Sequence, residues 1–218
     1  MQDAHARKSC TGILNVTGVI FGTIDDLSTR MSEGIVLREC LEMGGFSVRE
    51  GAKIGNPPDK LWRTLVAGRN LQGCKDLSLC RLAFINLFHH ISRLCSIDTT
   101  ELLEDETLDR YIHDFLRRVQ EVVWNRRMFT GKLMSLCGSD AEVELFGMVP
   151  KDARRGDLIC LLYGAGVPVI LREVPNPKGG LQYVLVGEAY VDDFMEGEAF
   201  QGSRGALLEK QEQEFALR

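Results

Sequence analysis

Histidine, cysteine and acidic side chains are the groups that most often bind metals or act in nucleophilic catalysis, and their spacing in this chain favours neither. His89 and His90 are adjacent, so on a helix they point about 100° apart and make poor joint ligands. The seven cysteines contain no C-x-x-C pair, and no H-E-x-x-H, G-x-S-x-G, G-x-G-x-x-G or Walker motif occurs. The sequence therefore predicts no metal site, no cofactor and no activated nucleophile.

Aromatic residues interleaved with a few charges suggest another kind of site. The aromatic residues are Trp62, Trp124, Phe129, Tyr163, Tyr183 and Tyr190, and the charges are Arg126, Arg127, Arg172 and Glu188. An apolar cavity with a few convergent polar groups is the usual design of a small-molecule site. The same aromatic residues can instead fill the core between helices and sheet, and the sequence leaves both interpretations open.

In the pocket interpretation, Tyr190, Glu188 and Arg127 are the candidate catalytic residues. A hydrogen bond from Arg127, Tyr163 or Tyr190 would polarise a substrate carbonyl, and Glu188 would act as a base. The substrate would be held by Trp62, Trp124, Phe129, Tyr163, Arg172 and Tyr183. In the structural interpretation, Glu188 pairs with Arg172 across neighbouring strands, and Tyr190 lies on the same face as Glu188.

The elements that must position these residues change in character along the chain. Thr11–Ile24 alternates small polar and β-branched residues, which predicts a strand. Helices are expected at Leu27–Met43, Asp59–Asn70, 76–96 and Leu108–Val123, with Asp25 and Asp26 at the start of the first and Gly44-Gly45 at its end. Asp98-Thr-Thr-Glu101 has the form of a capping box that would begin the helix carrying Leu108–Val123.

After Trp124, short apolar runs alternate with glycine and proline turns. Strands are expected at Arg127–Leu136, Leu158–Tyr163, Val167–Arg172 and Leu181–Tyr190, and Gly138–Glu144 is expected to be a mobile loop. The predicted fold class is α+β. A mainly helical part, 11–124, packs on a small antiparallel sheet or partly closed barrel, 125–218, within one domain over 1–218.

Composition limits the partners and the compartment. The chain has 218 residues with 26 Lys and Arg against 31 Asp and Glu, a net charge of −5, which offers no nucleic-acid footprint. The longest uncharged run, Ser9–Ile24, is shorter than the roughly 18 apolar residues of a membrane span. Scattered cysteines among apolar neighbours fit a reducing compartment, and we expect a cytoplasmic protein.

Several motifs resemble a known family when they are taken in order and spacing. They are Trp124–Thr130, Gly147–Pro150, Gly156-Asp157, Val167–Arg172 and Leu185–Val191, preceded by Leu61-Trp-Arg-Thr-Leu65. Together they resemble the C-terminal region of fungal heterokaryon-incompatibility (HET) proteins, over residues 60–200. The resemblance implies turns at Gly147–Pro150 and Gly156-Asp157, and a chain without the N-terminal effector domain of that family.

Two functions of different classes follow from the resemblance. In the first, the chain binds an apolar small-molecule precursor and promotes its cyclisation or isomerisation in specialised metabolism, without a cofactor. In the second, it is a non-catalytic recognition or regulatory module of heterokaryon incompatibility that binds a protein partner or a second copy of itself. The sequence favours the first slightly, because a regulator without its effector domain has no output of its own.

Overall fold

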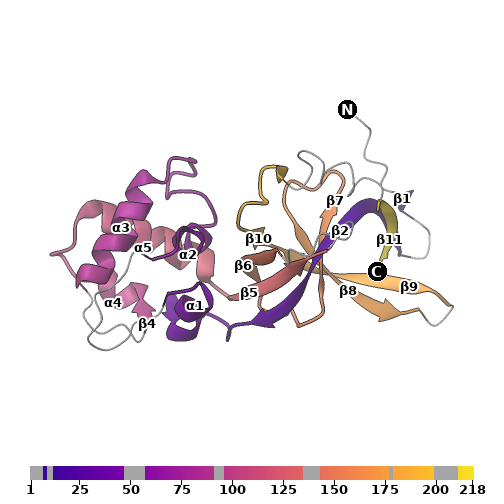
Figure 1. Cartoon of the computed structure of the whole chain (residues 1–218), viewed down its shortest axis with the longest axis horizontal. Coiled ribbons are helices and arrows are strands. Elements are labelled where there is room, and N and C mark those ends of the chain that lie inside the picture. The colour runs from indigo at the N-terminus through magenta and orange to yellow at the C-terminus, as the bar shows by residue number, and fades with distance from the viewer. Residues whose placement is uncertain are drawn as a thin grey trace. The chain divides into compact units, whose positions relative to one another are not determined.

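The computed structural model describes residues 7–8, 12–46, 57–90, 96–134, 143–176, 179–198 and 211–218. The chain divides into two compact units, Ser28–Met128 and a second unit formed by Met1–Leu27 together with Phe129–Arg218. We call the first the helical unit and the second the barrel unit; Figure 1 shows the elements of each. In chain order, the helical unit is therefore an insertion in the barrel unit.

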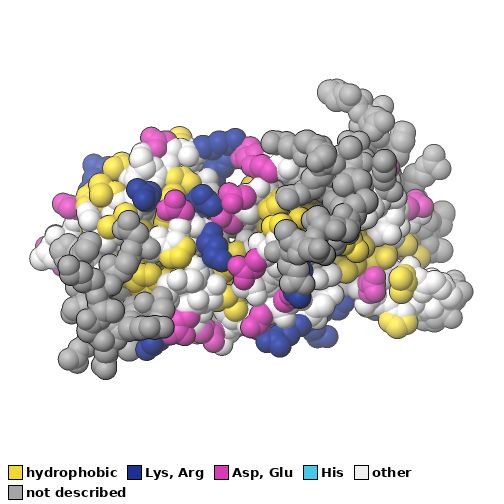
Figure 2. All heavy atoms as spheres, in the orientation of Figure 1, with side chains coloured by type: hydrophobic (Ala, Val, Ile, Leu, Met, Phe, Trp, Pro, Cys, Tyr) yellow, Lys and Arg dark blue, Asp and Glu magenta, His cyan; other side chains and the backbone are white. Residues whose placement is uncertain are grey.

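The surface mixes charges of both signs. Acidic and basic side chains are interspersed on the visible face of each unit, with hydrophobic side chains between them (Figure 2). This face carries no large patch of one sign, in keeping with the small net charge of −5. In the part of the chain that the structure describes, no helix has both the length and the apolarity needed to cross a bilayer.

Nine strands of the described residues form one sheet in the barrel unit. They are β1 (Arg7–Lys8), β2 (Leu14–Leu27), β5 (Arg126–Leu133), β6 (Glu144–Pro150), β7 (Leu158–Leu162), β8 (Val169–Pro175), β9 (Leu181–Glu188), β10 (Tyr190–Val191) and β11 (Gln213–Leu217). Their order is β10-β6-β5-β2-β11-β9-β8-β7, and β1 pairs with β2. Most neighbours are antiparallel, but β11 runs parallel to β9.

One long strand closes the barrel. The first part of β2 pairs with β11, and its later part pairs with β7 as well as with β5. Because β2 and β7 also pair, the strands β2, β11, β9, β8 and β7 form a closed ring of hydrogen-bonded neighbours. Closure removes the free edges of these five strands, while β5, β6 and β10 extend the sheet away from β2.

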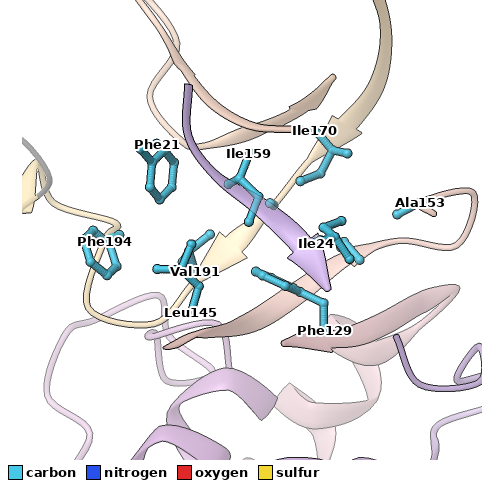
Figure 3. Packing of buried hydrophobic residues seen from close by; sticks show 11 residues of the cluster. Phe21, Ile24, Phe129, Leu145, Ala153, Ile159, Ile170, Val191 and Phe194 are labelled. Atoms are coloured by element: carbon cyan, nitrogen blue, oxygen red, sulfur yellow. The ribbon is translucent and has the colours of Figure 1, made fainter. Parts of the chain in front are cut away.

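Within the ring, Ile159-Cys160 of β7 and Val169–Leu171 of β8 are buried on both faces, which explains their continuous apolar runs. One cluster draws on all five ring strands and fills the ring: Cys160, Val169, Leu171, Tyr183, Phe215 and Leu217, with Val16, Ile20, Leu158 and Leu162 against them. A second cluster lies on the other face, where Ile159 and Ile170 meet Phe129 of β5 and Leu145 of β6 (Figure 3). Neighbouring residues such as Ile159 and Cys160 thus belong to different clusters, as the period of two in a strand requires.

The helical unit has a core of its own. Its helices are α1 (Arg38–Met43), α2 (Asp59–Leu65), α3 (Ser78–His90), α4 (Thr99–Leu103) and α5 (Arg110–Val123), and a two-stranded sheet joins β3 (Ile35–Leu37) to β4 (Ser96–Asp98). The apolar stripe of α5, including Phe115 and Val119, is buried. Phe84 of α3 packs at 5.8 Å from Phe115 and at 4.6 Å from Phe88, measured between ring centroids.

The predicted fold class is wrong. Strands, not helices, dominate the chain, and the sheet is large and mixed rather than small and antiparallel. The predicted N-terminal strand exists, but it is a central strand of the barrel sheet and does not belong to a mainly helical part. The order of elements along the chain led to the wrong fold class, because the helices lie between two strands, β2 and β5, that pair with each other.

Some predicted elements also shift. The first helix was expected from Leu27, but β2 runs to Leu27 and α1 begins only at Arg38. Asp25 and Asp26 do not cap a helix; they lie in β2 and form ion pairs with Lys132 and Arg155. Gly147–Pro150 is part of strand β6 rather than a turn.

Other expectations are confirmed. The helix over Leu108–Val123 exists as α5, although it begins at Arg110. Asp98 is a helix cap as predicted, because its carboxylate accepts hydrogen bonds from the backbone N–H groups of Thr100 and Glu101 at 3.0 and 3.2 Å. The helix that it caps is α4, however, which ends at Leu103 and is separate from α5. Residues 138–142 of the loop predicted to be mobile lie outside the described residues.

Candidate functional site

The motif residues Asp157 and Arg172 form a bidentate ion pair in the barrel unit. Arg172 Nε and Nη2 each lie 2.8 Å from one carboxylate oxygen of Asp157, which is 4% exposed. The same carboxylate accepts a hydrogen bond from the backbone N–H of Arg154 at 2.8 Å. Hydrogen bonding to Asp157 raises the pKa of Arg172 further, so this guanidinium stays charged.

This pair fixes the turn that precedes β7. Gly156 has a φ of +84°, which a side chain would strain, and its N–H donates to Ile24 O at 2.9 Å. The N–H of Ile24 donates in return to Asp157 O at 3.0 Å. Arg172 Nη2 also donates to Asp152 O at 2.7 Å. The Gly156-Asp157 motif therefore ties β2, the turn before β7 and β8 together.

The expected ion pair between Glu188 and Arg172 does not follow the register of the sheet. Glu188 of β9 is opposite Val169 of β8, whereas Arg172 is opposite Val184. An irregularity between Ile170 and Leu171 shifts the pairing between these two points. Arg172 directs its guanidinium to Asp157 instead, a residue that we had interpreted only as part of a tight turn.

Glu188 and Tyr190 lie on different strands. β9 ends at Glu188, and Tyr190 begins β10, which pairs with β6. Gly187 has a φ of +148°, and a Cβ on it would come within 2.7 Å of Pro150 Cγ, so this backbone conformation requires glycine. It lies just before the point where the chain stops pairing with β8 and begins to pair with β6. The hydroxyl of Tyr190 donates to Asp192 Oδ1 at 3.1 Å, and both residues are buried.

Three predicted substrate-binding residues of the barrel unit differ in their surroundings. Phe129 is fully buried in the cluster outside the ring, and Tyr183 packs edge-on against Phe215 at 5.0 Å inside it. Burial raises the pKa of the Tyr183 hydroxyl. Tyr163 is partly exposed, and its hydroxyl donates to Glu212 at 3.2 Å. Two of the three are thus core residues, as the structural interpretation of the aromatic residues expects.

The remaining candidates belong to the helical unit. The indole N–H of buried Trp62 donates to Asp59 at 3.0 Å, and Arg127 Nε donates to Ser28 O at 2.7 Å. Trp124, which follows α5, is 54% exposed. The nine candidates are therefore divided between two units, and their catalytic and binding roles stay predictions.

A pocket that the sequence did not suggest lies within the helical unit. It has a volume of about 80 Å³ and is lined by Asn70, Leu71, Gln72, Asp76, Leu79, Cys80, Tyr111, Asp114 and Phe115. None of the nine predicted site residues is among these. The available signal was that apolar residues occur on nearly all sides of α3, which is typical of a buried helix, although Leu79 is 61% and Leu82 44% exposed.

Metal ligation has no support in this geometry. Among the residues that the structure describes, no three or more His, Cys, Asp or Glu side chains gather where they could hold a metal ion. His113 Nε2 lies 3.0 Å from Asp105 O at the start of α5.

Comparison with known proteins finds a family match over part of the barrel unit. Residues 137–206, which include β6 to β10, match the Het-6 beta-barrel domain family. A stretch of 52 residues is 42% identical to heterokaryon incompatibility protein 6, OR allele, of Neurospora crassa; it covers 24% of this chain and only 8% of that relative. No solved structure matches the chain. The resemblance to fungal heterokaryon-incompatibility proteins is thereby confirmed, and residues 137–206 are similar to the Het-6 barrel domain.

Proposed function

We propose that this chain is a non-catalytic recognition module of fungal heterokaryon incompatibility, with the barrel unit as its scaffold. One observation carries the proposal: three polar residues of the motifs behind the family resemblance make contacts within the barrel unit. Asp157, Arg172 and Tyr190 are hydrogen-bonded to neighbours of the same unit. Side chains used in this way stabilise a scaffold, which leaves binding to the surface.

The surface supplies what a protein partner would bury. Leu181 and Leu185 of β9 are 56% and 50% exposed, and Leu79 and Leu82 protrude from α3. Hydrophobic side chains reach the surface of both units between charged ones (Figure 2). Burial of exposed apolar surface drives most protein association, so these leucines are suited to recognition.

The small-molecule interpretation receives less support. It requires Tyr190, Glu188 and Arg127 to converge on an apolar cavity, but Tyr190 donates to buried Asp192 and Arg127 donates to a backbone carbonyl. The pocket of the helical unit is lined by none of the three. A cyclase or isomerase would also need space beside these residues for a substrate, and the aromatic residues Phe129 and Tyr183 occupy core positions.

Expression in Neurospora crassa tests the proposal. The chain is introduced into a strain that carries the OR allele of heterokaryon incompatibility protein 6 and into a matched strain from which that gene is deleted. We expect viable transformants to differ in number between the two strains. The variant Ile170→Asp, which places a charge in the core of the barrel, serves as the inactive control. Equal numbers in both strains for the unaltered chain would contradict the proposal.

A further inference from the structure

We propose that the pocket between α3, α5 and the segment 70–76 binds an arginine side chain of a partner protein. This inference rests on the proposed function, because it names the partner chemistry that such a recognition module would read. Every residue of the pocket belongs to the helical unit.

One wall of the pocket is held in shape before any ligand binds. Asn70 Oδ1 accepts hydrogen bonds from the backbone N–H groups of Gln72 and Cys74, at 3.1 and 2.8 Å. Asn70 Nδ2 donates to Asp76 O at 3.1 Å, and the backbone N–H of Asn70 donates to Cys74 O at 3.0 Å. A single asparagine thus organises the segment, which lowers the entropy lost when a ligand is bound.

The floor is apolar and well packed. Buried Cys80 of α3 and Phe115 of α5 form this floor, and Phe115 packs against Phe84 beneath it. Burial raises the pKa of the Cys80 thiol, so that side chain is neutral and apolar at physiological pH. An aliphatic chain of three or four methylene groups suits such a floor.

Two carboxylates line the pocket, and they differ in whether they accept hydrogen bonds from the protein. Asp76 accepts hydrogen bonds from Ser78 N and Ser78 Oγ, at 3.1 and 2.5 Å. Asp114 is half-buried on α5 and has no hydrogen-bond or ion-pair partner among the described residues. A partner's cation would provide the missing interaction for Asp114.

Asp114 is placed to receive a guanidinium group. Tyr111 precedes it by three residues on α5, so the two side chains are neighbours on one helix face, and both line the pocket. A planar guanidinium can pair with the carboxylate in a bidentate manner and stack on the tyrosine ring, which an ammonium group does less well. Arg118, a basic residue close enough to act on the Cys80 thiol, is engaged elsewhere, with Val66 O, Arg69 O and Glu121.

The rim of the pocket provides further contact area. Leu79 and Leu82 are three residues apart on α3 and largely exposed. A partner segment that places arginine in the pocket would bury an adjacent apolar residue on these leucines. The partner chemistry is therefore a basic residue beside an apolar one.

Titration of the full chain with n-butylguanidinium, followed by ¹H–¹⁵N correlation spectra, tests the inference. We expect saturable shifts at amides of 70–72, 76–80 and 111–115. The neutral isostere n-butylurea should bind at least about fivefold more weakly, because it lacks the charge that pairs with Asp114. Absence of saturable shifts, or equal affinity for the two probes, would overturn the inference without any variant being made.

A matched pair of variants locates the charge. Asp114→Asn should weaken binding of n-butylguanidinium about fivefold or more, whereas Glu106→Gln, which removes an exposed carboxylate outside the pocket, should leave it unchanged. Equal effects of the two variants would mean that net charge rather than the pocket attracts the probe, and would overturn the inference. If the probe does not bind but the number of Neurospora transformants still differs between the two strains, only the pocket inference is refuted. If the probe binds but the two strains give equal numbers of transformants, only the proposed function is refuted.

Discussion

Glu188 ends β9 and Tyr190 begins β10, so a break between two strands separates residues that have only Ala189 between them. On an ideal strand, side chains two residues apart lie on the same face of the sheet. This rule predicted that Glu188 and Tyr190 would both lie beside Arg172. The rule fails here because Gly187 adopts a φ of +148° and Ala189 N–H donates to Pro168 O, so the strand ends between them. The importance of Arg172 was predictable from its motif, but its partner Asp157 depends on a register that no local pattern specifies.

Replacement of Tyr190 by phenylalanine tests the structural role of its hydroxyl. The change removes the hydrogen bond to Asp192 and leaves that buried carboxylate with one donor fewer. We expect the free energy of unfolding to fall by about 1 kcal/mol, and the melting temperature by roughly 2–4 °C. Thermal unfolding followed by circular dichroism measures this. An unchanged melting temperature would show that the hydroxyl does not stabilise the fold.

At the scale of elements, amphipathic and capping patterns predicted helices correctly, but the pairing of distant strands could not be predicted from local patterns. The apolar stripe of α5 and the cap at Asp98 are local features, and both are present in the structure. Asp25 and Asp26 have the composition of a helix start, but the pairing of β2 with β5, in which Asp26 lies opposite Thr130, overrides it. Strand β6 was missed because Gly147 and Pro150 suggested a turn, although both lie within its bounds.

The bidentate ion pair of Arg172 holds several elements of the barrel, so its removal has a large expected effect. Arg172→Ala would leave the buried carboxylate of Asp157 without its cation. We expect a loss of about 3 kcal/mol, at the low end of the range for breaking a buried pair, because the Arg172 side chain is itself 23% exposed. The melting temperature should fall by roughly 6–12 °C.

Arg155→Ala provides the matched control for that measurement. Arg155 also pairs with an aspartate, Asp26, but both side chains are largely exposed, at 69% and 49%. Exposed pairs contribute about 0–1 kcal/mol, so the melting temperature should change by a few degrees at most. If Arg172→Ala has no larger effect than this control, the pair does not stabilise the barrel.

At the scale of the whole molecule, buried acidic groups link stability to alkaline pH. Burial raises the pKa of the thiols of Cys40, Cys80 and Cys160 and of the hydroxyl of Tyr183. A raised pKa in the folded state means that the folded chain holds its protons more tightly than the unfolded chain does. The stabilisation is therefore complete below the pKa of an unfolded thiol, about 8.5, and is lost as pH rises above it.

Urea denaturation between pH 7 and pH 10.5 measures this dependence. We expect the free energy of unfolding to decrease steadily above about pH 8.5. Cys160→Ala should reduce the slope, because it removes the most strongly shifted thiol, whereas Cys74→Ala, at an exposed position, should not. If the free energy of unfolding falls equally steeply with pH in the unaltered chain and in both variants, Cys160 does not cause the pH dependence.

The order of elements along the chain concealed the architecture of the whole molecule. Helices follow the first strand and precede the others, so the sequence suggested a helical half and a sheet half. The chain instead leaves the barrel unit after Leu27 and returns at Phe129, and these two residues are register partners in β2 and β5. Just beyond them, Ser28 N–H donates to Met128 O at 2.9 Å, and Met128 N–H donates to Ser28 Oγ at 2.9 Å. The helical unit is thus inserted at the end of a paired hairpin.

The same arrangement explains why residues 125–218 should not fold alone. That fragment lacks β2, which pairs with β5, β7 and β11 and closes the ring. A single cooperative unit over 1–218 stays a prediction, and its test must keep β2 with the later strands.

Excision of the helical unit is the most direct test of the insertion. Residues 28–128 are replaced by Asn-Gly, which forms a two-residue hairpin turn of the kind that joins register partners such as Leu27 and Phe129. We predict that the shortened chain unfolds in one cooperative thermal transition, and that Arg172→Ala lowers its melting temperature as it does in the full chain. A shortened chain without a cooperative transition would contradict the account and show that the barrel depends on the helical unit.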